Sequence, residues 1–192
     1  MKRKWKLWMI AFVVFVMTDI MMQSNRAEAK KRTFTVSSKT IPCSSSYRQK
    51  PYYNKKTKQY YMINSYMRRL STTGGTLKLK KGTYKIPGTI YVPSNVKIVC
   101  ANGVKIKKTK ATGTKKVKST KFLFQMISEE KASGKQNTGK YAASKNASIQ
   151  GNGKVIFDMG NVNGATAVFV GHASGITCLL YTSPSPRDIS GS

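Results

Sequence analysis

Four short runs of alternating apolar and polar residues follow one another between residues 74 and 107, separated by turns rich in Gly, Pro and Asn. The runs are Thr76–Lys80, Thr83–Ile86, Thr89–Val92 and Val96–Cys100. An apolar residue at every second position predicts β-strands with one buried face and one solvent face. Few folds accommodate turns at this density.

The pattern is typical of the opening coils of a right-handed parallel β-helix, an all-β solenoid with a dry interior and a wet exterior. Gln59–Leu70 carries Ile63 and Met67 at helical spacing, which predicts an amphipathic helix just before the first coil. We expect this helix to be a short N-terminal cap over the open end of the solenoid core.

Asn residues recur immediately before predicted strands, at Asn95 and again at Asn146. Because Asn tolerates the left-handed conformation, we expect both residues at sharp corners of the chain. Further strands are predicted at Lys154–Phe157 and Ala165–Val170. The excursion 109–141 is read as a strand near Phe122–Ile127 between exposed loops.

The N-terminus has the composition of a secretory signal peptide over residues 1–29. Basic residues precede the apolar stretch Leu7–Met17, and Ala27-Glu28-Ala29 predicts cleavage after Ala29. An uncleaved anchor is the alternative, and it is the one route by which we expect membrane contact. Either reading predicts a secreted or cell-surface bacterial protein, in which residues 30–58 form a polar leader.

The C-terminal string CLLYTSPSPRD, Cys178–Asp188, resembles the translation of a sequencing-library adapter. We therefore expect residues 178–192 to be a non-native tail and the β-helix region, 59–177, to be C-terminally truncated. A natural flexible terminus is the alternative. Truncation in the middle of a stack predicts an exposed strand edge around Ala165–Thr177.

The net charge is +29 for the whole chain and +26 between Lys30 and Thr177, where three acids remain. Outside the cell, such a charge attracts acidic polysaccharides, cell-wall polyanions, anionic lipids and released DNA. Nucleic acid is not the expected partner, because no helix-turn-helix, OB or RRM pattern is present. The alternative is that lysines on exposed strand faces serve solubility and block edge pairing.

The segments GGTLKLKKGTYKI, VPSNVKI, ANGVKIKK and ASIQGNGKVIFD resemble the pectin lyase-like superfamily, especially bacterial secreted right-handed β-helix proteins of the pectate lyase superfamily. The resemblance covers about residues 60–177. It implies an exported protein that binds or processes an anionic polysaccharide, as a lyase or a polygalacturonase-like hydrolase, with Ca²⁺ as cofactor in the lyase case. The alternative is a non-enzymatic adhesin or wall-attached structural solenoid.

No catalytic, cofactor-binding or metal-binding residue is assigned from the sequence. Lyases of this family cluster acids around Ca²⁺, and the hydrolases need two carboxylates at one bond. Glu129 and Glu130 are adjacent in a loop-like stretch, whereas Asp158 is expected to be structural. His172 has no acidic neighbour and is expected in a solvated turn. Any active site is therefore expected in a missing C-terminal part, with this fragment inactive alone.

Two cysteines, Cys43 and Cys100, lie between the signal peptide and the tail. An oxidising environment would allow a disulfide that closes a loop between them. Cys100, however, occupies an inward position of its alternating strand, where free Cys is common as a small apolar residue. The sequence leaves both the disulfide and two thiols open, and favours the thiols.

Overall fold

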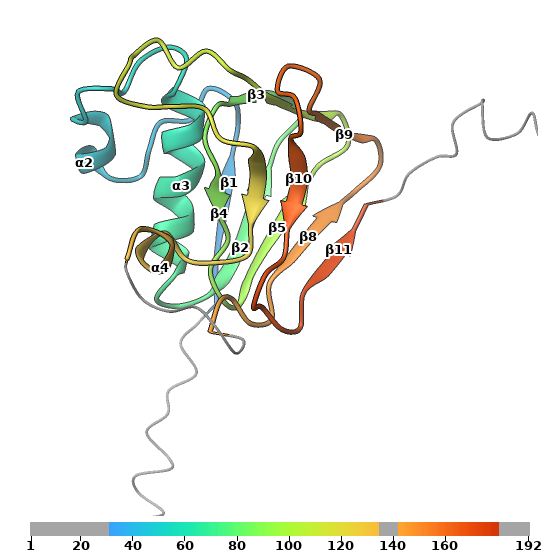
Figure 1. Cartoon of the computed structure of the whole chain (residues 1–192). Coiled ribbons are helices and arrows are strands. Elements are labelled where there is room, and N and C mark those ends of the chain that lie inside the picture. Colours follow the sequence, from blue (N-terminus) through green and yellow to red (C-terminus); the bar gives the residue numbers. More distant parts are fainter. Residues whose placement is uncertain (1–30, 135–141, 181–192) are drawn as a thin grey trace, which may run out of the picture. The chain divides into compact units, whose positions relative to one another are not determined.

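Three parallel sheets make up most of the structure, a computed structural model that describes residues 31–134 and 142–180 (Figure 1). The strands are β1 (Arg32–Val36), β2 (Gly75–Leu79), β3 (Gly82–Ile86), β4 (Ile90–Tyr91), β5 (Val96–Cys100), β6 (Val104–Lys108), β7 (Phe122–Gln125), β8 (Ser148–Gly151), β9 (Val155–Asp158), β10 (Thr166–Phe169) and β11 (Thr177–Leu179). The helices are α2 (Ser45–Arg48), α3 (Lys58–Leu70) and α4 (Glu129–Ser133). The expected signal peptide and tail residues 181–192 lie outside the described residues.

Strands join the three sheets in rotation along the chain. The sheet orders are β1-β2-β5-β8-β11, β3-β6-β9 and β4-β7-β10, and all neighbouring strands are parallel. After β1, the chain passes once through each sheet and then returns to the first. The expected all-β class, with strands in parallel sheets, is confirmed, and the predicted strand bounds differ by two residues at most.

The chain turns into strands β2, β5, β8 and β11 of the largest sheet through a left-handed residue. Asn95 and Asn146 have φ angles of 59° and 52°, and Gly74 and Gly175 have 66° and 62° at the matching corners. The amide of Asn95 donates to the carbonyl of Lys145 on the next corner, at 2.8 Å. The expected left-handed corners at the two asparagines are confirmed, and main-chain hydrogen bonds join them between successive strands.

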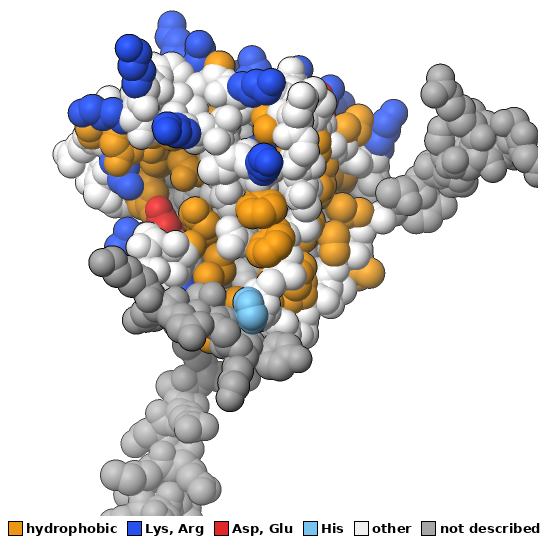
Figure 2. Space-filling view, in the orientation of Figure 1, with side chains coloured by type: hydrophobic (Ala, Val, Ile, Leu, Met, Phe, Trp, Pro, Cys, Tyr) orange, Lys and Arg blue, Asp and Glu red, His pale blue; other side chains and the backbone are white. Residues whose placement is uncertain are grey.

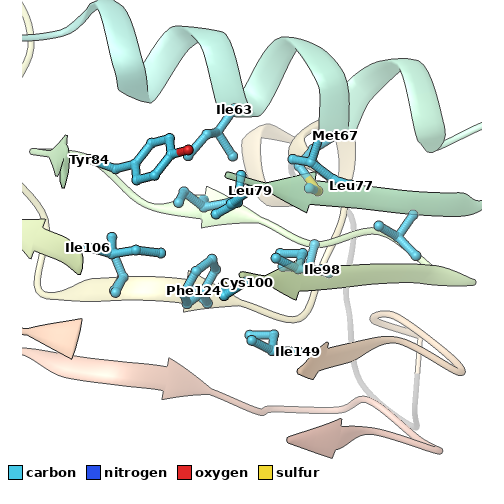
Figure 3. Close-up of a cluster of buried hydrophobic side chains, with 14 of the residues drawn as sticks. Ile63, Met67, Leu77, Leu79, Tyr84, Ile98, Cys100, Ile106, Phe124 and Ile149 are labelled. Carbon is cyan, nitrogen blue, oxygen red and sulfur yellow. The ribbon is translucent and has the colours of Figure 1, made fainter. Parts of the chain in front are cut away.

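Apolar side chains lie in rows inside the three sheets (Figure 3). Leu77, Ile98 and Ile149 occupy one row, in register across β2, β5 and β8, and all three are fully buried. Burying each of these side chains contributes roughly 1.5–3 kcal/mol. The alternation read from the sequence therefore positions the core.

Helix α3 covers the first strands of the sheets, packing against β2, β3 and β4 (Figure 1). Ile63 and Met67 point from the helix into the core, together with Met62 and Leu70 (Figure 3). The predicted helix is confirmed and begins one residue earlier than expected. Its opposite face is left to solvent, which places Arg68 and Arg69 outside.

Two segments are more ordered than the sequence suggested. Residues 30–58, read as a polar leader, contain β1 and α2. The run RTFTV does alternate, but it is short and follows two lysines. Glu129 and Glu130, read as loop, begin α4, where the Ser128 side chain accepts the amide of Lys131 as an N-cap.

The sheets end at exposed edges in β10 and β11. Phe169 and Val170 are partly exposed there, and Leu179 is 59% exposed. The predicted edge is therefore present in the described residues. Strand β11 includes Cys178 and Leu179, which pair with Ile149 and Gln150 of β8, so the adapter-like string begins inside a strand.

Candidate functional site

A basic groove of about 980 Å³ lies between β1, α2 and α3. Its four cationic side chains come from β1, from the loop after α2 and from the last turn of α3: Arg32, Lys50, Arg68 and Arg69. Phe34 supplies aromatic surface, the buried Tyr47 lies behind the lining, and the other lining residues are Cys43, Ser44, Ser46, Ser65, Thr72 and Thr73. No acidic side chain is among the lining residues of this groove.

The local fold explains why cations gather in the groove. Arg68 and Arg69 follow the buried Met67 and precede the buried Leu70, so helical periodicity turns both guanidinium groups away from the core. Positive charge in the last turn also complements the negative end of the helix dipole. Arg32 reaches the same groove from β1, the edge strand of the largest sheet.

The aromatic side chains of the groove are held by their neighbours. Phe34 packs against Tyr66 with ring centroids 5.3 Å apart. Tyr47 is buried and its hydroxyl donates to Glu129 Oε2 at 2.6 Å. Burial, and then this carboxylate, raise the pKa of Tyr47 well above its usual value, so it stays a neutral donor. Lys50 Nζ lies 4.8 Å from the Tyr47 ring centroid.

Among the described residues, the acidic side chains that contact lining residues of the groove come from α4, where Glu129 contacts Tyr47 and Glu130 contacts Arg68. Glu130 Oε1 lies 3.5 Å from Arg68 Nε, and both side chains are about half exposed. Figure 2 shows a small acidic patch at the left of the molecule, near the position of α4 in Figure 1, with basic side chains close by. The groove is therefore lined by basic side chains, one of which, Arg68, is paired with a carboxylate.

Asp158 lies on a different sheet from the groove. Its Oδ2 is 3.1 Å from Lys105 Nζ and 4.0 Å from Lys107 Nζ, on the outer face of β3-β6-β9. The hydrogen bond from Lys105 lowers the pKa of Asp158, so it remains ionised. His172 is exposed at a corner with φ 55°, and its carbonyl accepts the amide of Ala143. The structure brings neither side chain to the groove.

Lys108 is a second candidate for chemistry, because the core of a protein rarely holds an amine. Burial lowers its pKa to about 7, in the range of a general base. Nζ donates to Gly88 O at 2.5 Å, Phe122 O at 2.8 Å and Thr120 Oγ1 at 3.1 Å. The side chain is fully buried, so no polysaccharide reaches it. Its role is to bind carbonyl groups between two sheets.

Cys43 and Cys100 are separate free thiols in this structure. Cys100 is fully buried, and burial raises its pKa to about 12. Cys43 is exposed at the groove, where its Sγ donates to Ser65 O at 3.2 Å. The inward position expected for Cys100 is confirmed.

The described residues offer binding groups more readily than catalytic ones. Glu129 and Glu130 are engaged by Tyr47 and Arg68, and Asp158 is engaged by lysines on another sheet. Within residues 31–134 and 142–180, no three His, Cys, Asp or Glu side chains are grouped to hold a metal ion. In the same part of the chain, no helix has the length and apolar character needed to span a membrane.

The sequence did not reveal this groove. Its four cations are scattered among 35 Lys and Arg residues and become neighbours only through packing. The available signal was the pair Arg68-Arg69 on the exposed face of a predicted helix. Comparison of the chain with protein-family models, curated proteins and solved structures finds no match.

Proposed function

We propose that this chain forms the first coils of an exported right-handed parallel β-helix protein that binds an anionic polysaccharide in the groove between β1, α2 and α3. The rotation of strands among three parallel sheets supports the β-helix, and α3 is then its N-terminal cap. The resemblance to the pectin lyase-like superfamily suggests a polyuronate as the ligand.

The convergence of four cations in one groove without a lining acid carries this proposal. Arg presents a planar fork that matches a carboxylate with two hydrogen bonds, and three of the four cations are Arg. The groove also supplies hydroxyl groups from Ser and Thr, which suit the hydroxyl groups of a sugar, and aromatic surface from the partly exposed Phe34.

Binding, rather than cleavage, is the function that the groove supports. A hydrolase needs two carboxylates at one bond, and a Ca²⁺-dependent lyase needs clustered acids. Glu129 and Glu130 are engaged by the groove residues Tyr47 and Arg68. Cleavage of the polysaccharide by a lyase or a hydrolase mechanism is suggested by the family resemblance alone. It would need residues beyond the described ones.

The proposal is tested by titrating the full chain with polygalacturonate and with its fully methyl-esterified, uncharged form. Calorimetry should detect the acidic polymer only, with affinity that falls as salt rises. The double variant Arg32→Gln/Arg69→Gln should weaken binding by about tenfold or more, because two charge-assisted contacts are lost.

A matched control removes the same charge from a different surface. Lys78 and Lys97 are exposed on the outer face of the largest sheet, away from the lining of the groove. Lys78→Gln/Lys97→Gln should therefore change the affinity by less than about twofold, since distant surface charges are screened. Equal losses in the two double variants would show that total charge, and not the groove, attracts the polymer.

A further inference from the structure

Helix α4 brings two of the chain's own carboxylates to the groove. Glu129 accepts the Tyr47 hydroxyl at 2.6 Å, and Glu130 contacts Arg68 at 3.5 Å. Tyr47 and Arg68 both line the groove. Between Lys30 and Thr177 the sequence has three acids, so two of the three contact groove residues.

The two contacts differ in strength. Tyr47 is 2% exposed and its hydrogen bond to Glu129 is short, which makes this contact the anchor of α4. The Arg68–Glu130 pair is 59% and 50% exposed, and exposed ion pairs contribute little to stability and weaken with salt. Glu130 can therefore leave Arg68 while Glu129 keeps α4 in place.

We propose that Glu130 is a built-in competitor that occupies Arg68 until an acidic polysaccharide displaces it. This inference rests on the proposed function, because it concerns the same groove. The carboxylate of Glu130 and that of a uronate offer the same two oxygens to one guanidinium, so Arg68 pairs with one of them at a time. The groove thus discriminates against ligands of low charge density, which compete poorly with an internal carboxylate.

A displaced Glu130 side chain has polar surroundings available. It also lines an adjacent cavity of about 250 Å³, together with four serines, Ser71, Ser94, Ser128 and Ser144, and with Lys131. Hydroxyl and ammonium groups solvate a carboxylate. Displacement therefore needs a change of side-chain rotamer and no movement of the sheets.

The experiment compares Glu130→Gln with Asp158→Asn, since each removes one negative charge. Asp158 is the matched control because it pairs with lysines on another sheet. In calorimetric titrations with polygalacturonate at low salt, Glu130→Gln should bind about two- to fivefold more tightly, the range expected for release of an exposed ion pair. Asp158→Asn should bind as the parent chain does.

The same titration in an Arg68→Gln background isolates the pair. Without Arg68, Glu130→Gln should no longer tighten binding. If Glu130→Gln and Asp158→Asn increase the affinity equally, or if Glu130→Gln still increases the affinity without Arg68, Glu130 is not a competitor for Arg68. If the parent chain binds polygalacturonate and Glu130→Gln binds equally well, this inference alone fails. If neither the parent chain nor any variant binds polygalacturonate, both this inference and the proposed function fail.

Discussion

The buried amine of Lys108 makes the stability of this protein depend on pH in a predictable direction. Lys108 is fully buried and has three oxygen acceptors, two of them main-chain carbonyls. Burial lowers its pKa from 10.5 to about 7. Between these two values the unfolded chain holds the proton and the native chain releases it, so stability rises with pH.

The magnitude follows from the shift in pKa. When the unfolded chain binds one proton more than the native chain, the free energy of unfolding rises by about 1.4 kcal/mol per pH unit. Because the native Lys108 is still partly protonated near pH 7, the gain in stability between pH 7 and pH 9 is about 2 kcal/mol. The interval ends at pH 9 because burial raises the pKa of Cys100 from 9.0 to about 12, which lowers stability as the pH rises further.

The assay is urea unfolding at pH 7 and pH 9 for the parent chain, Lys108→Met and Lys107→Met. Met keeps the length of the side chain and removes the amine. The parent chain and Lys107→Met, altered at the outward neighbour on the same strand, should each gain about 2 kcal/mol more than Lys108→Met between the two pH values. Equal pH dependence in all three proteins would refute a buried amine that releases its proton.

Two further predictions concern the corners and the thiols. Asn95 has a φ of 59°, so Asn95→Gly should leave the urea midpoint nearly unchanged, whereas Asn95→Ala should lose about 1 kcal/mol; equal losses would argue against strain at this corner. Exposed Cys43 should react with iodoacetamide in the native chain while buried Cys100 reacts only after unfolding, as measured by mass spectrometry; a fully protected Cys43 would instead indicate a disulfide.

The strands and the main helix could be predicted because their signal is local. Alternation at every second residue defines β5 with the observed bounds Val96–Cys100, and the spacing of Ile63 and Met67 defines α3. Strand β1 was missed because its five residues contain one fully buried side chain, Val36, and its pairing with β2 spans a long stretch of sequence. Local pattern does not specify such a distant partner.

The groove could not be predicted because it depends on tertiary packing. Arg32 and Arg68 are far apart in the sequence, and each resembles the many basic residues on exposed faces. For Lys108 the local pattern and the residue type disagree. The alternation that begins with Val104 and Ile106 places its side chain inward, although a charged amine prefers solvent. The structure resolves the conflict by supplying three acceptors for its amine.

Charge on this protein has different consequences on different surfaces. Apart from the buried Lys108, the lysines on the strands point outward one at a time, and Asp158 pairs with Lys105 and Lys107 on their sheet. That arrangement suits solubility and protection of the sheets from edge pairing. The groove instead concentrates cations from two elements and a loop, and among the described residues the acids that contact its lining come from α4. Net charge alone therefore indicates a class of partner, whereas under the proposed function we expect the groove and Glu130 together to select polyanions of high charge density.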